Sequence, residues 1–268
     1  MKIGLCTNML ADSSDPVGMA FLPLLKRIGC DYAELPLRGV AGLSEADYGT
    51  LKAKLNELDL PVLCCNDFLP ITLRVIGEEY QEKQLRDYLA LALTRARELG
   101  VGKVIFGSAK SRNRASGYPM EKALAEVKKS LQIMCEQAAL RNIVISIEHL
   151  NRLESNLINS FEESAAMVDE LGIANLRTIL DYYHFALGNE DDDLITRYGD
   201  RIGHIHFACT LARHTPDLND LEELKPAFER IKSTGYDDTF SLEGYAPDLR
   251  EKEEKYAAVI SRIKELTA

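Results

Sequence analysis

The chain has 268 residues, 46% of them hydrophobic, and a formal net charge of −10. This length suits one large α/β domain, no apolar run is long enough to cross a bilayer, and the excess of acidic residues opposes binding to nucleic acid. The first residues, MKIGLCTN, enter a strand directly without the layout of a signal peptide. We therefore expect a cytoplasmic protein that binds neither nucleic acid nor membrane.

Short β-like segments alternate with longer helical segments along the whole chain. Leu85, Leu89, Ala92 and Ala96 form one helical stripe, and glycines such as Gly172 end several helices just before the next strand. The expected strands are residues 2–8, 31–37, 61–68, 103–109, 143–149, 176–182, 201–208 and 239–245.

Eight strands alternating with helices predict a parallel sheet, and eight is the number that closes a barrel. A doubly wound open sheet is the alternative, but it usually has a glycine-rich first turn, which LCTNMLADS lacks. No linker or low-complexity tract interrupts the chain. We expect an α/β fold with a single (β/α)8 TIM barrel over residues 1–268.

Polar side chains mark the ends of the last four expected strands. Glu148, Asp181, His206 and Glu243 lie near the carboxyl ends of strands five, six, seven and eight. Neighbouring strands are ~4.8 Å apart, so four inward-facing groups on consecutive strands can converge on one point. Any one of these groups alone is as readily explained by a structural ion pair. Together, however, three crowded carboxylates repel one another unless a cation holds them.

This set of three carboxylates and one imidazole predicts one bound divalent metal ion. Oxygen and imidazole ligands suit Mn²⁺, Mg²⁺ or Co²⁺ better than an ion that prefers thiolates. We expect Mn²⁺, with Mg²⁺, Co²⁺ or Zn²⁺ as alternatives.

Four segments carry a family resemblance. The run IEHLNRLESNLINS resembles the Glu-x-Leu-Asn-Arg-x-Glu segment of D-tagatose and D-psicose 3-epimerases. These enzymes are a branch of the xylose-isomerase-like TIM barrels, the superfamily of sugar phosphate isomerases and epimerases. LDYYH resembles their Asp-x-x-His strand end, IGHIHFA their Gly-His-x-His strand, and SLEGY the strand with their final metal-binding glutamate. The first half of the chain is similar through YAELPL and the segment from Asn66 to Pro70.

The resemblance implies roles for individual residues. Glu148, Asp181, His206 and Glu243 are implied as metal ligands, and two further residues, Glu154 and His184, as groups that hold the sugar near its carbonyl end.

The resemblance also implies a substrate-binding arginine six residues after the ligand histidine. That position is Ala212 here, so the role is carried to Arg213, with a surface charge as the alternative. Asn66, Asn8, Cys6 and Glu34 end the first three strands and are expected to line the pocket or simply to fill the barrel.

A basic loop follows the fourth strand. Lys110, Arg112 and Arg114 lie within five residues of one another in an otherwise acidic protein. At the mouth of a barrel they predict binding of a phosphate or carboxylate on the substrate, or closure as a lid. A solvated loop paired with neighbouring acids is the alternative. The basic loop favours an anionic sugar derivative over the neutral sugar, with Lys110 and Arg112 as substrate-binding residues.

The expected activity is that of a metal-dependent epimerase or isomerase of a ketose, keto-sugar or sugar phosphate. The metal chelates a carbonyl oxygen and its neighbouring hydroxyl and stabilises the enediolate formed when the α-proton leaves. Glu148 and Glu243 act as acid and base on opposite faces, which inverts the carbon. If only one base reaches the substrate, the same site catalyses aldose–ketose isomerisation.

Three other functions remain open from the sequence. A lyase that dehydrates keto-inositols would use the same enediolate. An endonuclease-type barrel requires a trinuclear zinc cluster, for which five histidines leave little. A non-catalytic sugar-binding subunit would lack one of the four ligands, and all four are present. We expect a small sugar as the partner and a homo-oligomer, either a dimer or a tetramer.

Overall fold

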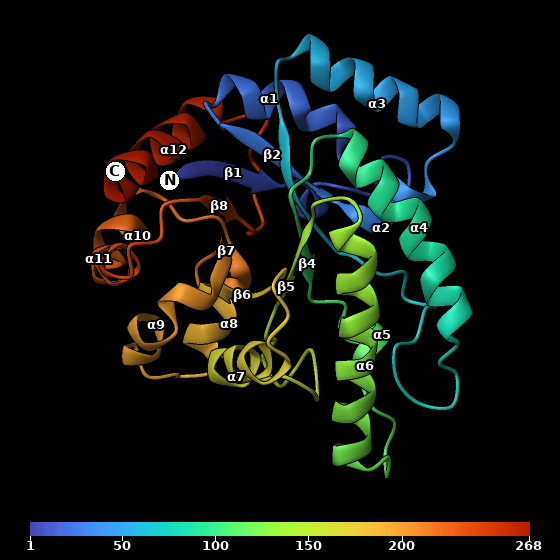
Figure 1. Cartoon of the computed structure of the whole chain (residues 1–268). Coiled ribbons are helices and arrows are strands. Elements are labelled where there is room, and N and C mark those ends of the chain that lie inside the picture. Colours follow the sequence, from blue (N-terminus) through green and yellow to red (C-terminus); the bar gives the residue numbers. More distant parts are fainter.

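The computed structural model describes residues 1–268 and shows eight parallel strands closed into a barrel in sequence order (Figure 1). Strand β1 closes the ring by pairing with β8, with Ile3 opposite Phe240. The predicted single (β/α)8 barrel is confirmed, and each strand lies within its expected segment. The strands are β1 (Lys2–Cys6), β2 (Tyr32–Pro36), β3 (Val62–Asn66), β4 (Lys103–Phe106), β5 (Val144–Ile147), β6 (Leu176–Asp181), β7 (Ile202–Phe207) and β8 (Thr239–Leu242).

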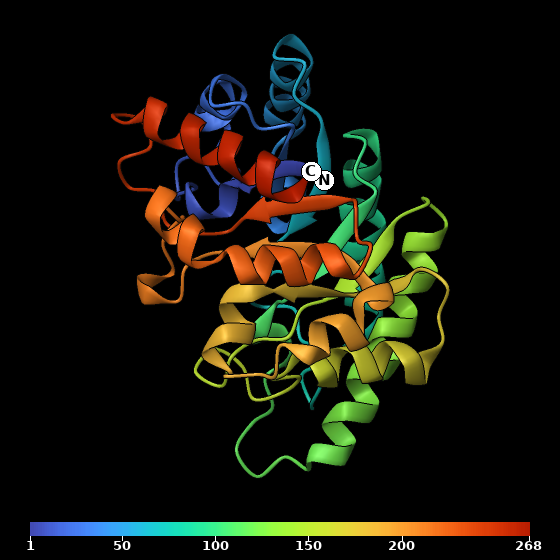
Figure 2. The same ribbon diagram turned by 90° about the vertical axis from the view of Figure 1, so that its left-hand side faces the viewer.

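Helices surround the barrel, and the two chain termini lie side by side (Figures 1 and 2). None of the helices is both long and apolar enough to cross a membrane. Their bounds are α1 (Leu22–Arg27), α2 (Leu37–Gly42), α3 (Glu45–Glu57), α4 (Glu82–Glu98), α5 (Ala109–Arg112), α6 (Met120–Ala139), α7 (Phe161–Leu171), α8 (Tyr182–Leu187), α9 (Asp193–Arg197), α10 (Leu218–Glu223), α11 (Lys225–Ser233) and α12 (Glu253–Thr267).

Local sequence explains where several helices begin and end. The Ser44 side chain accepts the N–H of Asp47 at the start of α3, which satisfies one of the free amides of the first turn. Helix α7 ends at Gly172, whose φ of 59° is in the left-handed region that glycine adopts without strain. The predicted glycine stop is therefore confirmed at this helix.

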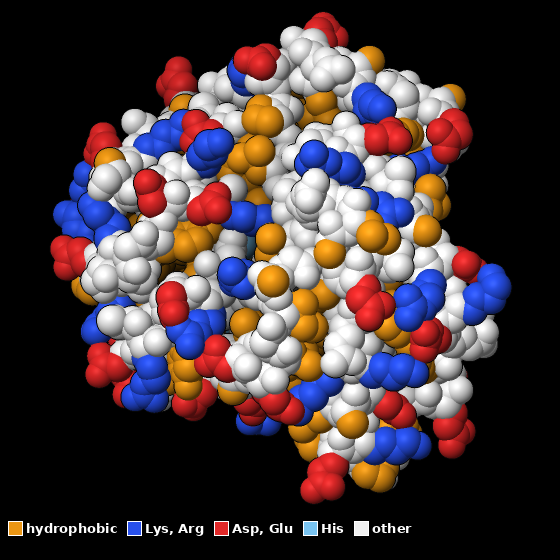
Figure 3. Space-filling model, viewed as in Figure 1, with side chains coloured by type: hydrophobic (Ala, Val, Ile, Leu, Met, Phe, Trp, Pro, Cys, Tyr) orange, Lys and Arg blue, Asp and Glu red, His pale blue; other side chains and the backbone are white.

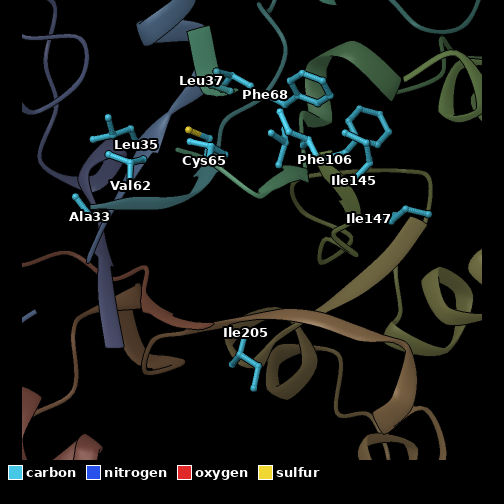
Figure 4. Close-up of a cluster of buried hydrophobic side chains, with 14 of the residues drawn as sticks. Ala33, Leu35, Leu37, Val62, Cys65, Phe68, Phe106, Ile145, Ile147 and Ile205 are labelled. Atoms are coloured by element: carbon cyan, nitrogen blue, oxygen red, sulfur yellow. The ribbon is translucent and has the colours of Figure 1, made fainter. Parts of the chain in front are cut away.

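The main hydrophobic core lies between the strands and the helices. Leu35, Phe106, Ile147 and Ile205 belong to it and come from four different strands (Figure 4). Their neighbours in sequence point to the opposite face, because side chains alternate along a strand. On the outer surface, acidic and basic side chains are mixed over the face shown in Figure 3.

The barrel interior has a small apolar floor with polar groups around and above it. Tyr32, Cys64, Ile105 and Ile179 form the floor. A Cβ atom at Gly4 would lie 2.5 Å from the Tyr32 ring, so glycine at this position makes room for the ring. The polar residues of the interior approach the carboxyl ends of the strands, where TIM barrels place their active sites.

Candidate metal centre and substrate pocket

Four buried side chains converge at the carboxyl ends of β5 to β8. Glu148, Asp181, His206 and Glu243 each offer a ligand atom, and these atoms all lie within 4.8 Å of one another. The Nδ1 atom of His206 lies 3.2 Å from Glu243 Oε2, 3.4 Å from Glu148 Oε1 and 3.9 Å from Asp181 Oδ2. The structure thus brings together the four residues that the sequence singled out as ligands.

The strand register explains this convergence. Asp181 pairs with His206 across β6 and β7, so both point inward at one level of the barrel. Glu148 and Glu243 directly follow β5 and β8, and their N–H groups still bond to Phe106 and Phe207 of the neighbouring strands. These ladder bonds hold both glutamates at the rim of the barrel.

Gly107 gives the Glu148 carboxylate its space. A Cβ atom at this position would collide with the Glu148 side chain. Glycine directly after β4 is therefore required by the geometry of the site, and no local pattern in the sequence distinguishes it from other glycines.

The four residues fit a divalent cation. Oδ2 of Asp181 is buried and has no hydrogen-bond partner, and a buried carboxylate oxygen without a partner is costly. Carboxylate oxygens with one imidazole nitrogen form a ligand set that suits Mn²⁺ or Mg²⁺. Both the geometry of the four side chains and the chemistry of their donor atoms therefore fit a divalent cation.

Without a cation, the two glutamates differ in protonation. Burial raises the pKa of Glu148 above its ordinary value, and the charge of Glu243 raises it further. Burial also acts on Glu243, but the charges of His206 and Arg213 outweigh it and lower the pKa of that carboxyl. Two neighbouring carboxyl groups whose pKa values are pushed apart suit opposite acid and base roles.

Beneath the four residues, Glu34 connects two histidines. Its carboxylate lies 2.9 Å from Nε2 of His206 and 2.9 Å from Nε2 of His204, and it accepts the Ser241 hydroxyl at 2.6 Å. This contact turns Nδ1 of His206 toward the three carboxylates of the cluster, as a carboxylate behind a ligand histidine does in metal sites. The sequence placed Glu34 only at the pocket wall, because its partners lie about 170 residues away.

Arg213 lies in the site and not on the surface. Its guanidinium donates to Glu243 Oε2 at 2.6 Å and lies 3.6 Å from Glu154 Oε1. The φ angles of Ala212 and Arg213 are 54° and 48°, an uncommon left-handed pair for residues other than glycine. This backbone turn brings residue 213 into the pocket.

His184 and Glu154 are linked by Asn151. The amide nitrogen of Asn151 lies 2.9 Å from Nδ1 of His184 and donates to Glu154 Oε1 at 3.0 Å. Nε2 of His184 is left without a hydrogen-bond partner, 3.7 Å from Asp181 Oδ2. Asn151 belongs to the LNR segment, yet no local pattern marks it as a positioning residue, because its partner His184 lies 33 residues away.

On the opposite side of the site, two amides bond to Glu243. Asn66 and Asn8 donate to Glu243 Oε1 at 2.9 and 3.0 Å. Both residues line a cavity of about 310 Å³ together with Glu148, Glu154, His184, Arg213 and Lys110.

The basic loop after β4 corrects one expectation. The structure places Lys110 at the cavity, but Arg112 is fully buried behind the strands and donates to the main-chain carbonyls of Phe106 and Glu148 at 3.0 and 2.7 Å. Helix α5 turns Arg112 away from the mouth, and its guanidinium holds the chain that carries Glu148. The guanidinium of Arg114 donates to the carbonyl of Tyr118, and neither arginine lines this cavity.

Comparison with known families and sequences agrees with this architecture. Residues 22–266 match the model of the family described as xylose isomerase-like TIM barrels. D-psicose 3-epimerase of Enterocloster bolteae is 32% identical over 84 residues, which cover 31% of this chain and 28% of the relative. L-ribulose 3-epimerase of Mesorhizobium japonicum is 25% identical over 121 residues, covering 45% and 40%. The matched stretches span less than half the length of these curated relatives.

Solved structures resemble the chain over its whole length. A 3-keto-D-glucoside 4-epimerase from E. coli aligns with a TM-score of 0.79 at 20% identity, covering 98% of this chain and 99% of the other. A D-psicose 3-epimerase crystallised in the presence of D-fructose aligns with a TM-score of 0.83 at 14% identity, covering 100% and 99%. At these identities the likeness establishes the fold.

Proposed function

Because this chain belongs to the family of xylose isomerase-like TIM barrels, we propose that it is a divalent-metal-dependent epimerase or isomerase of a keto-sugar. The observation that carries the proposal is the convergence of Glu148, Asp181, His206 and Glu243 at the catalytic end of the barrel. Relatives that are named as 3-epimerases of D-psicose and L-ribulose support it.

Glu148, Asp181, His206 and Glu243 would hold the ion, with Mn²⁺ as the expected metal. A bound divalent ion supplies Lewis-acid stabilisation of the negative charge that develops on the substrate oxygens. Glu34 holds the His206 ring so that Nδ1 faces the other ligands.

Glu148 and Glu243 carry the proton transfer in this proposal. They come from the first and the last of the four strands, β5 and β8, and therefore stand on opposite flanks of the ligand set. One removes the proton from the carbon beside the carbonyl, and the other returns a proton to the opposite face.

Three further groups orient the sugar. Arg213 offers N–H donors beside Glu243, and Glu154 lies within reach of the same guanidinium. His184 lines the cavity, and its buried Nε2 has no hydrogen-bond partner. Since only Lys110 of the basic loop lines this cavity, we now favour a neutral sugar over a phosphorylated or acidic one.

The test compares Glu148→Gln and Glu243→Gln with the wild type, each loaded with Mn²⁺ and supplied with D-psicose or D-fructose in deuterated water. Each substitution keeps the shape of the side chain but removes the proton acceptor, so turnover falls by at least ~10². A two-base site also predicts asymmetry, because one variant still exchanges the α-proton with solvent while it fails to invert the carbon. Proton exchange and product are followed by NMR.

The matched control is Glu57→Gln, because Glu57 is exposed at the end of α3. Near-normal inversion in both active-site variants would refute the acid–base roles. If the wild type moves the carbonyl between neighbouring carbons without inverting either, the protein is an isomerase and not an epimerase.

A further inference from the structure

A second cavity adjoins the one over the metal centre. It measures about 570 Å³, whereas the first measures about 310 Å³, and Asn8, Arg38, Asp67 and Ile71 line both. Its walls come from the loop after β1, from α2 and from the loop after β3. The two cavities therefore share part of their lining, and together they extend from Glu243 to Gly42 of α2.

We propose that the second cavity is a subsite for the non-reacting unit of an extended substrate, so that the protein acts on a keto-sugar that carries a glycosidic substituent, such as a disaccharide. This inference rests on the proposed function, since it takes the reacting ring to lie over Glu148 and Glu243. Each cavity alone is within the size range of small-molecule sites. The pair exceeds what a single sugar ring requires.

The lining suits an uncharged sugar unit. Pro16, Pro36 and Pro70 provide apolar surface for the face of a sugar ring. The cation of this cavity, Arg38, is already paired with Asp67 through Nε at 2.5 Å. Because the charges of this pair balance, the cavity is not built to attract a phosphate, while the other guanidinium N–H groups of Arg38 can donate to hydroxyls.

The wall of the second cavity is formed by tightly packed main chain. A Cβ atom at Gly39 would collide with the carbonyl oxygen of Pro16, so the loop after β1 rests directly on α2. Asn8 stands between the two cavities and donates to Glu243 Oε1 at 3.0 Å. A ligand in the second cavity would thus contact Asn8, which bonds to the proposed acid or base Glu243. Through this contact, binding of the non-reacting sugar unit can raise turnover at the reacting unit.

Gly42 allows the second cavity to be filled without disturbing the first. It lines only the second cavity, and a Cβ atom there has no neighbour within 4 Å. Gly42→Trp is therefore expected to fold and to block the subsite. Gly49→Trp is the matched control, because Gly49 lies exposed on α3 and a Cβ atom there also has no neighbour within 4 Å.

The experiment measures kcat/KM of the Mn²⁺-loaded proteins for D-fructose and for three disaccharides with a fructose unit, lactulose, leucrose and isomaltulose. We expect at least one disaccharide to exceed D-fructose by ~10-fold or more in the wild type. Gly42→Trp removes that advantage but changes the value for D-fructose by less than ~2-fold, because Gly42 lines the second cavity and not the one over Glu148 and Glu243. Gly49→Trp changes neither value.

Two results would overturn the subsite while the proposed function stands. One is turnover of D-fructose with no disaccharide used better, and the other is a disaccharide advantage that survives in Gly42→Trp. Absence of proton exchange with D-fructose and with all three disaccharides would overturn the proposed function together with the subsite.

Discussion

Glu34 lies at the centre of the barrel and accepts hydrogen bonds on both carboxylate oxygens. His204 donates to one oxygen and His206 to the other. Without a cation, the contacts with His206 and His204 outweigh the effect of burial and hold the pKa of Glu34 well below its ordinary value. Its position decides which nitrogen of His206 faces the proposed metal.

Glu34→Gln is predicted to weaken Mn²⁺ binding by roughly 10- to 100-fold, because an amide offers one acceptor where two N–H donors converge. Isothermal titration calorimetry with Mn²⁺ measures the affinity directly. Glu57→Gln on the exposed end of α3 is the control. An unchanged affinity in Glu34→Gln would show that Glu34 only fills the barrel.

Gly107→Ala tests the space that the Glu148 carboxylate occupies. The added methyl group displaces this side chain, and we predict a loss of Mn²⁺ affinity of ~10-fold or more, as for other changes that misplace a ligand. Elemental analysis after desalting measures the retained metal. Gly102→Ala is the control, since a Cβ atom at Gly102 meets nothing within 4 Å. Equal retention in both variants would contradict the prediction.

At the scale of elements, α7 begins with two caps. Ser160 accepts the N–H of Glu163 at 3.1 Å, and Glu190 accepts the N–H of Phe161 at 2.8 Å. Burial raises the pKa of Glu190 to about 7, although its hydrogen bonds from the main chain of Phe161 and Glu162 oppose this shift. The carboxyl also lies 3.5 Å from Nε2 of the buried His149.

This pKa predicts a dependence of stability on pH. The folded state binds the Glu190 proton more tightly than the unfolded chain, whose glutamates titrate near pH ~4.3, so the free energy of unfolding falls as pH rises from there to about 7. Glu190→Gln carries no group that loses this proton, so its free energy of unfolding should rise relative to the wild type by roughly 1–2 kcal/mol across that pH window. The gain stays modest because residual solvent contact screens the carboxylate. Urea unfolding at several pH values measures the difference. A difference independent of pH would contradict the assignment.

At the scale of the whole molecule, the proposed metal centre would connect the strands of one half of the barrel. Its four residues come from β5, β6, β7 and β8 or directly follow these strands, so an ion bound there joins segments that separate on unfolding. Without a cation, burial and the charge of Glu243 raise the pKa of Glu148, so the crowded acidic groups are unfavourable until a cation binds.

We therefore predict that Mn²⁺ raises the melting temperature. At ~100 times its dissociation constant an ion that binds only the folded state adds about 2.7 kcal/mol. At ~2–4 °C per kcal/mol for a chain of about this size, the melting temperature should rise by roughly 5–10 °C. Asp181→Asn keeps the cap on α8 but removes one ligand charge, so its shift should be smaller. Differential scanning calorimetry with Mn²⁺, Mg²⁺, Co²⁺, Zn²⁺ and EDTA measures the shift. Identical shifts in the wild type and in Asp181→Asn would argue against the site.

The net charge of −10 also bears on function. It repels polyanions, and of the five histidines only His206 belongs to the four-residue cluster. We predict no metal-dependent nicking of abasic DNA in a gel assay. Nicking that disappears in His206→Ala would replace the proposed sugar chemistry with that of an endonuclease.

The sequence by itself determined the barrel and the position of the four clustered residues along it. Strand alternation and the order of the βα units decide which residues face inward and at which end, and both are local properties. Asp181 and His206 are accordingly found together, although their role in holding a metal stays a prediction.

Only the tertiary structure decided which distant groups meet. Arg112 lies in a basic loop that predicts a cation at the rim, but it bonds to a buried main-chain carbonyl. Glu34 contacts two histidines from across the barrel. Arg213 enters the pocket through a left-handed backbone turn. The second cavity depends in the same way on how the loop after β1 packs on α2. Such contacts are set by packing between segments far apart in the chain, and no local period of the sequence records them.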